Sequence, residues 1–122
     1  TRFGFRDLIS RGAVDIVQPD VTRAGGFSEV KKILALAEAY NLTYAPHNFG
    51  SAVCLAASLQ MAAAAPNFLI LEYDVTANPL REDLPATRPP KVRDGSVEVP
   101  DAPGLGLEID EEALTRYKIK RD

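Results

Sequence analysis

The sequence predicts an α/β fold with parallel strands, because three short apolar runs alternate with helical segments. The runs are residues 14–19, 42–46 and 68–71, and each is followed by an ionisable residue. Helical patterns of about a dozen residues, 27–40 and 51–64, separate them. Strands joined by one helix pair in parallel with right-handed crossovers. We therefore expect three adjacent parallel strands in chain order, with the helices on the outer face.

Helix signals are uneven in the first part of the sequence. Phe5, Leu8 and Ile9 recur at helical spacing, but no start signal precedes them, and the first residue is Thr1 rather than Met. We therefore expect the chain to be truncated at its N-terminus. The next helix begins near Ser28, whose hydroxyl is suited to cap the first turn.

The composition changes sharply partway along the chain and divides it into residues 1–74 and a tail, residues 75–122. Six of the nine prolines fall in the tail, and the alternation of strands and helices stops there. Within the tail, residues 92–99 carry an Asp-Gly pair between two short runs, which predicts a hairpin. A final short helix is expected to open at Asp110, with acidic residues at its positive end.

The overall composition is that of a globular protein of 122 residues, with 46% hydrophobic and 25% charged residues and a net charge of −3. No block of like charge indicates a nucleic-acid partner, and the apolar stretch 51–65 is too short to span a bilayer. The single cysteine, Cys54, lies in an apolar helical pattern, so we interpret it as a buried residue rather than a nucleophile. No signal peptide is recognised, and the expected location is the cytoplasm.

Three ionisable residues, Asp20, His47 and Glu72, follow the three predicted strands. Taken singly, each has a structural explanation: a surface histidine, an aspartate that caps a turn or helix, and a solvated strand end. The carboxyl ends of parallel strands meet at one edge, however, where the active sites of repeating β/α folds form. Their joint placement indicates a general base, His47, oriented by Asp20, and we expect the two side chains about 2.6–3.2 Å apart.

Several neighbouring polar residues have alternative interpretations. Asn48 either lines the pocket beside the base or only satisfies backbone groups. Gly25 and Gly26 serve the turn from strand to helix, with contact to an anion as the weaker alternative. Glu29 and Glu38 are typical of a helix surface, and no carboxylate in the sequence is assigned as a metal ligand.

Six short motifs occur in an order that resembles a known family. They are Gln18-Pro19-Asp20, Ala24-Gly25-Gly26, Ala45-Pro46-His47, Pro66-Asn67-Phe68, Leu71-Glu72-Tyr73 and Pro103-Gly104-Leu105-Gly106. The sequence resembles the C-terminal part of an enolase-superfamily enzyme of the mandelate racemase/muconate lactonizing enzyme family, mandelate racemase subgroup. The resemblance implies that residues 1–74 form the last part of a modified (β/α) TIM-type barrel. Residues 75–122 would then pack on the N-terminal capping domain.

The resemblance also implies a role for each candidate residue. His47 is the base that takes the proton next to a substrate carboxylate, or the acid that returns it. Asp20 accepts the other ring N–H of His47 and fixes its tautomer. Glu72 hydrogen-bonds the substrate carboxylate, which requires it to carry a proton. Asn48 and Gln18 are assigned to substrate binding.

The cofactor that the resemblance implies is Mg²⁺, with ligands in a missing N-terminal half of the same protein. We therefore expect this chain alone to be inactive and that half to be its partner. The expected substrate is a small-molecule carboxylate, with no nucleic-acid or membrane partner, and the expected assembly is a homo-oligomer.

The preferred activity is a lyase reaction in which a sugar acid loses water through an enediolate and gives a 2-keto-3-deoxy acid. A racemase or epimerase acting on a 2-hydroxy acid or related carboxylate is the first alternative, because it shares the same proton abstraction. A non-catalytic barrel fragment is the second. Preference for the lyase rests on analogy within the family.

Overall fold

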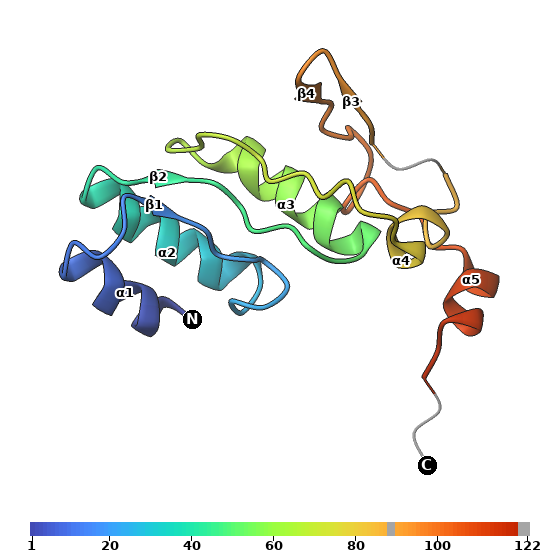
Figure 1. Cartoon of the computed structure of the whole chain (residues 1–122), viewed down its shortest axis with the longest axis horizontal. Helices are drawn as coiled ribbons and strands as arrows, with labels where there is room; N and C mark the ends of the chain where they lie inside the picture. The colour runs from blue at the N-terminus through green and yellow to red at the C-terminus, as the bar shows by residue number, and fades with distance from the viewer. Residues whose placement is uncertain (88–89, 120–122) are drawn as a thin grey trace.

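The computed structural model describes residues 1–87 and 90–119. Its first part contains α1 (Arg2–Ser10), β1 (Ile16–Val17), α2 (Phe27–Ala39), β2 (Thr43–Tyr44) and α3 (Ala52–Ala64). Its second part contains α4 (Pro79–Glu82), β3 (Val92–Arg93), β4 (Ser96–Val97) and α5 (Glu111–Arg116). Figure 1 shows α1 and α2 on one side of β1 and β2, whereas α4, α5 and the β3–β4 hairpin gather at the other end of the chain.

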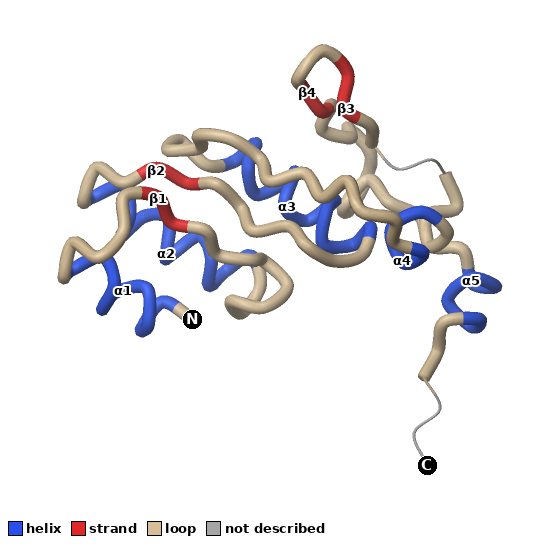
Figure 2. Tube along the Cα trace, in the orientation of Figure 1, coloured by secondary structure: helices blue, strands red, loops and turns tan. Residues whose placement is uncertain are grey.

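The first part is organised around parallel pairing. β1 and β2 are parallel, with Ile16 opposite Thr43 and Val17 opposite Tyr44. Tyr44 also forms a parallel bridge with Phe68. The predicted order and direction of the three segments are therefore confirmed. Figure 2 shows how short the paired strands are beside the loops that follow them.

The prediction of a full strand over residues 68–71 is wrong, because this segment joins the sheet through one bridge only. Tyr44 donates its N–H to the carbonyl of Asn67 and accepts the N–H of Leu69, both at 2.8 Å. In a parallel ladder the next bond would run from the backbone nitrogen of Pro46, two residues after Tyr44, to the carbonyl of Leu69. Proline has no N–H, so the ladder ends there.

β1 ends for the same reason. The N–H of Ala45 donates to the carbonyl of Val17 at 3.1 Å, and the next donor from β1 in this register is the nitrogen of Pro19. Both strands are consequently shorter than the predicted ranges 14–19 and 42–46. The residues that follow the two prolines leave the sheet at the same edge.

The core of the first part forms where α2 packs against the strands and the neighbouring helices. Its buried residues include Ile9 from α1, Val17 and Tyr44 from the strands, Val30, Ile33, Leu34 and Ala37 from α2, and Ala57 and Met61 from α3. Helices predicted over 27–40 and 51–64 are confirmed to within one residue at each end. The helical pattern at the start of the chain is also confirmed, although Leu8 is 44% exposed.

The cap assigned to Ser28 is wrong. α2 begins at Phe27, and its N-cap is Gly26, which has a φ of 81°. Glycine adopts this left-handed region without a steric cost, so the chain enters the helix before Ser28. Glu29, in the first turn, accepts the backbone N–H of Arg2 at 2.8 Å and ties α2 to α1.

Both local signals recognised in the tail are confirmed. Asp94 and Gly95 have φ values of 49° and 75°, as the two central residues of a type I′ hairpin turn require. Asp110 caps α5 by accepting the backbone N–H groups of Glu112 and Ala113 at 2.9 and 3.0 Å. Each element forms from residues close in sequence, which is why the sequence predicts it.

α4 is an element that the sequence analysis missed. Its N-cap is Asn78, whose side chain accepts the N–H of Leu80 at 3.0 Å, and Pro79 occupies the first helical position. This Asn-Pro pair is a typical start signal. Four residues, however, are too few to show a helical period.

Among the described helices, none has the length and apolar character needed to cross a membrane. Cys54 is free and buried in α3. Its interpretation as a buried residue is therefore confirmed.

Ile33→Ala tests the packing of α2 on the strands. Ile33 is fully buried, so we expect the substitution to lower the free energy of unfolding by about 2–5 kcal/mol in urea denaturation. The matched control is Ile119→Ala, at a residue that is 83% exposed, which should change it by less than about 0.5 kcal/mol. Equal effects of the two substitutions would contradict this core.

Candidate active site

Asp20 and His47 lie immediately after Pro19 and Pro46, where β1 and β2 stop pairing. Nδ1 of His47 is 2.9 Å from Oδ2 of Asp20. The predicted hydrogen-bond contact is therefore confirmed, across 27 positions of sequence. The Asp20 side chain is only 5% exposed, whereas the His47 side chain is 36% exposed. The carboxylate is thus buried behind an imidazole that remains open to solvent.

The second oxygen of Asp20 is fixed by Thr22. Oδ1 accepts the backbone N–H of Thr22 at 2.7 Å and its hydroxyl at 2.6 Å. The sulfur of Cys54 lies 3.8 and 3.9 Å from the two carboxylate oxygens and completes the enclosure. The sequence analysis missed both neighbours. The Asp20-Val21-Thr22 order could have indicated Thr22, because an aspartate commonly accepts from the residue two positions ahead.

These contacts keep Asp20 ionised. Burial raises the pKa of Asp20, but the hydrogen bonds from the Thr22 hydroxyl, from His47 and from the Thr22 backbone outweigh it, so the pKa lies below its ordinary value. An ionised carboxylate can only accept hydrogen bonds, so Nδ1 of His47 must carry the hydrogen between them. In the neutral imidazole, Nε2 then has a free lone pair.

Cys54 is a thiol rather than a thiolate beside this carboxylate. Burial raises its pKa, and the charge of Asp20 raises it further. A buried, protonated thiol is not a nucleophile, in agreement with the structural interpretation of this residue.

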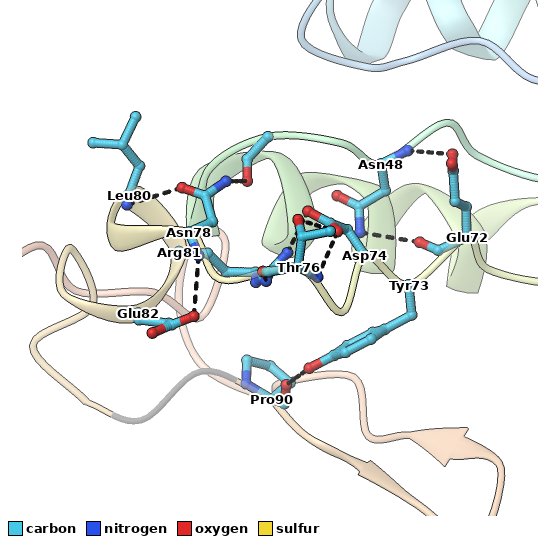
Figure 3. Close-up of polar contacts among 11 residues, drawn as sticks. Asn48, Glu72, Tyr73, Asp74, Thr76, Asn78, Leu80, Arg81, Glu82 and Pro90 are labelled. Carbon is cyan, nitrogen blue, oxygen red and sulfur yellow. Dashed lines mark hydrogen bonds and ion pairs between the residues drawn. The ribbon is translucent and has the colours of Figure 1, made fainter.

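Glu72 and Asn48 make a second pair at the same edge. The backbone N–H of Asn48 donates to Oε2 of Glu72 at 2.9 Å, and Nδ2 of Asn48 donates to the backbone carbonyl of Glu72 at 3.1 Å (Figure 3). Asn48 is buried. Because Asn48 follows His47 directly, this double contact ties Glu72 to the segment that carries the imidazole.

The remaining candidate, Gln18, follows β1 and is exposed. No hydrogen bond joins its side chain to another candidate among the described residues. As for metal binding, the described residues contain no group of three or more His, Cys, Asp or Glu side chains that could hold an ion.

A buried aspartate hydrogen-bonded to a partly exposed histidine lies here at the carboxyl ends of parallel strands joined by a helix. That edge is where active sites form in repeating β/α folds. Residues 1–113 match the family model described as "Enolase C-terminal domain-like". This chain therefore belongs to the enolase superfamily, as a C-terminal domain of the mandelate racemase/muconate lactonizing enzyme family.

Two curated relatives show which enzymes this chain is similar to. It is 42% identical to the D-galactarolactone cycloisomerase of Agrobacterium fabrum, over 97% of this chain and 33% of that protein. It is 40% identical to the D-xylonate dehydratase of Haloferax volcanii, over 98% of this chain and 29% of that protein. The chain thus spans about a third of their length. They are a cycloisomerase and a sugar-acid dehydratase rather than mandelate racemases in particular.

Among solved structures, the chain is similar to an enolase from Agrobacterium radiobacter, described as a putative galactarate dehydratase with bound Na and L-malate. The TM-score is 0.85 and the identity 34%, over 95% of this chain and 33% of that one. The likeness extends over most of this chain, so its short strands and long loops are arranged as in the matching third of that structure.

Asp20→Asn tests the charge of the buried carboxylate. The pKa of Asp20 is lowered in the folded protein, so its charge stabilises the fold above the unfolded-state value of about 3.9 and this contribution is lost as pH falls through the folded-state pKa. We expect Asp20→Asn to be less stable than the native protein at pH 7, with the difference narrowing below about pH 4. Urea denaturation at a series of pH values measures this.

The matched control for that measurement is Asp15→Asn, at an exposed aspartate just before β1. We expect this substitution to leave the pH dependence of unfolding unchanged. A stability difference for Asp20→Asn that persisted undiminished at pH 2 would show that shape, and not charge, causes it.

Proposed function

We propose that this chain supplies the acid–base part of an active site that moves the proton next to a substrate carboxylate. It would do so as the C-terminal third of a longer enzyme, called the complete enzyme below, because it spans about a third of its relatives. The observation that carries the proposal is the 2.9 Å contact between the ionised Asp20 and Nδ1 of His47.

His47 is suited to this chemistry in four respects. Its Nδ1–H is held by Asp20, which leaves Nε2 to accept a proton. The resulting imidazolium would be stabilised by the adjacent carboxylate. Histidine also changes charge near neutral pH, which suits it to take and return a proton. Its side chain is 36% exposed, so a substrate can reach the ring.

Glu72 is suited to hold the substrate carboxylate. Asn48 occupies one of its oxygens, Oε2, by donating the backbone N–H at 2.9 Å. Oε1 remains for the substrate and, when protonated, would donate to a carboxylate oxygen instead of repelling it. The bound L-malate of the related Agrobacterium radiobacter structure supports a carboxylate ligand. Asn48 and Gln18 remain proposed substrate-binding residues.

The Mg²⁺ that the family resemblance implies does not fit the described residues of this chain, since none of them form a ligand cluster. Its ligands would have to come from the rest of the complete enzyme. Such a cation stabilises negative charge on an oxygen of the reacting group. Residues 75–122 are proposed to contact the capping domain of that enzyme.

Dehydration of a sugar acid is the preferred reaction, and the similarity to a D-xylonate dehydratase supports it. After His47 or another base has taken the α-proton, loss of the β-hydroxyl as water gives a 2-keto-3-deoxy acid. The imidazolium of His47 would assist by protonating the departing hydroxyl. Proton return without loss of water would instead give a racemase or epimerase, which remains the alternative.

His47→Asn in the complete enzyme removes the proposed base. We expect turnover to be abolished, because Asn cannot take up a proton, and folding to remain nearly intact, because the ring lies at the rim. Asp20→Asn should lower kcat by about 10²–10⁴-fold, since the imidazole loses the group that fixes its tautomer. Steady-state kinetics and thermal melts of each variant measure the two effects.

Two results would contradict these roles. Full activity of His47→Asn would show that His47 is not the base. A Tm lowered by many degrees in that variant would show that the residue serves mainly to stabilise the fold.

The fate of the α-proton separates the two reactions. The complete enzyme is incubated with Mg²⁺ in D₂O with a panel of acid sugars that includes D-xylonate and D-galactonate, the substrates named for its relatives. We expect a 2-keto-3-deoxy acid from one of them, because the enediolate loses its β-hydroxyl. Product formation is followed by a keto-acid assay, and deuterium at the α-carbon by NMR.

EDTA should abolish this activity, and the 122-residue chain alone should show none. Deuterium that enters the α-carbon without loss of water would identify a racemase or epimerase. Turnover that resists EDTA, or activity of the chain alone, would contradict the assignment to this class of reaction.

A further inference from the structure

The segment that follows Glu72 is closed by a buried ion pair. Nη1 of Arg81, in α4, lies 2.6 Å from Oδ2 of Asp74, and the two side chains are only 10% and 5% exposed. Nη2 of Arg81 also donates to the backbone carbonyl of Thr76. Figure 3 shows these groups converging just beyond Glu72. The guanidinium therefore ties α4 back to the residues that directly follow the proposed substrate-binding carboxyl.

Asp74 is held in the same way as the aspartate of the His47 pair. Oδ1 of Asp74 accepts the N–H of Thr76 at 2.9 Å and its hydroxyl at 2.7 Å. The sequence Asp-Val-Thr occurs at both places, and in both the second carboxylate oxygen is aimed at a nitrogen of another side chain. The Thr76 hydroxyl and backbone, followed by Arg81, keep the pKa of Asp74 below its ordinary value despite burial. The ion pair is therefore charged near neutral pH.

Both ends of this closed segment touch the loop that carries the imidazole. At one end, Glu72 accepts the backbone N–H of Asn48 at 2.9 Å. At the other end, Nδ2 of Asn78 donates to the carbonyl of Gly50, also at 2.9 Å, while the Asn78 side chain caps α4 (Figure 3). Residues 72 and 78 are thus attached to residues 48 and 50, and Arg81 braces the chain between them.

We propose that Arg81 is a positioning residue for Glu72. The inference rests on the proposed function, in which Glu72 binds the substrate carboxylate. Arg81 fixes Asp74, two residues beyond Glu72, and so holds the Glu72 carboxyl against the Asn48 N–H. A buried ion pair is by itself weak evidence for added stability. Its location, between two attachments to the loop of His47, points to alignment of the site.

The test is a double-mutant cycle in the complete enzyme. Arg81→Gln is made alone and together with Glu72→Ala, and kcat and KM are measured with the acid sugar of the panel that is turned over fastest. We expect Arg81→Gln alone to lower kcat/KM by about 10–100-fold, the range expected for a displacement of about 1 Å in a binding group. In the Glu72→Ala background it should change kcat/KM less than about threefold, because the group it positions is already gone.

Two further variants keep the cycle interpretable. Arg81→Lys preserves the charge if Arg81→Gln fails to fold; it removes the planar fork that bonds Asp74 and Thr76 together, and it should show the same dependence on Glu72. The matched control is Arg116→Gln, in α5, whose ion pair with Asp83 is 3.7 Å long and largely exposed. It should leave kcat/KM unchanged in both backgrounds.

The outcomes separate the inference from the function on which it rests. Equal losses from the Arg81 variants with and without Glu72 would assign Arg81 to fold stability alone and overturn the inference. No loss from those variants would overturn it as well. Full turnover by Glu72→Ala would overturn the proposed role of Glu72 itself, and with it the positioning role of Arg81.

Discussion

Parallel pairing that stops at a proline is the constraint on which the rest of this structure depends. β1 and β2 lie side by side in register, and Pro19 occupies the position where their ladder needs its next N–H. Pro46 occupies the equivalent position in the ladder between β2 and residues 67–69. Proline cannot supply this N–H, so both chains must leave the sheet one residue before Asp20 and His47. Two polar side chains from distant parts of the sequence therefore meet at one edge, on top of an apolar core.

Once the two chains are placed, local hydrogen bonds determine the chemistry of the pair. Burial alone would favour a neutral Asp20, but two donors from Thr22 and one from His47 make the ionised form the stable one. Arg23 also lies 3.6 Å from this carboxylate, yet its side chain is 68% exposed. A contact with so much solvent around it contributes little. Thr22, more than Arg23, therefore keeps Asp20 in the ionised form that accepts the Nδ1–H of His47.

The same arrangement of three residues appears twice, with different partners. In one copy the aspartate faces a histidine, and in the other it faces Arg81. Threonine two residues ahead satisfies one oxygen in both, which leaves the second oxygen with a defined direction. Two hydrogen bonds from one threonine thus orient a carboxylate in a loop, where no helix or strand fixes the backbone. The carboxylates of Asp20 and Asp74 therefore have defined orientations, although both lie in loops.

The sequence alone determined the features that depend on neighbouring residues: the order of helices and strands over residues 1–64, the turn at Asp94-Gly95 and the cap at Asp110. It also indicated the Asp20–His47 pair, because parallel strands bring their carboxyl ends together. Only the tertiary structure decided how far each strand pairs, because the length of pairing depends on the register of the strands. That register places the nitrogen of Pro46 beside Leu69, where a hydrogen-bond donor is needed. It likewise decided that Arg81 is buried against a carboxylate, because periodicity cannot reveal which side of a four-residue helix is covered.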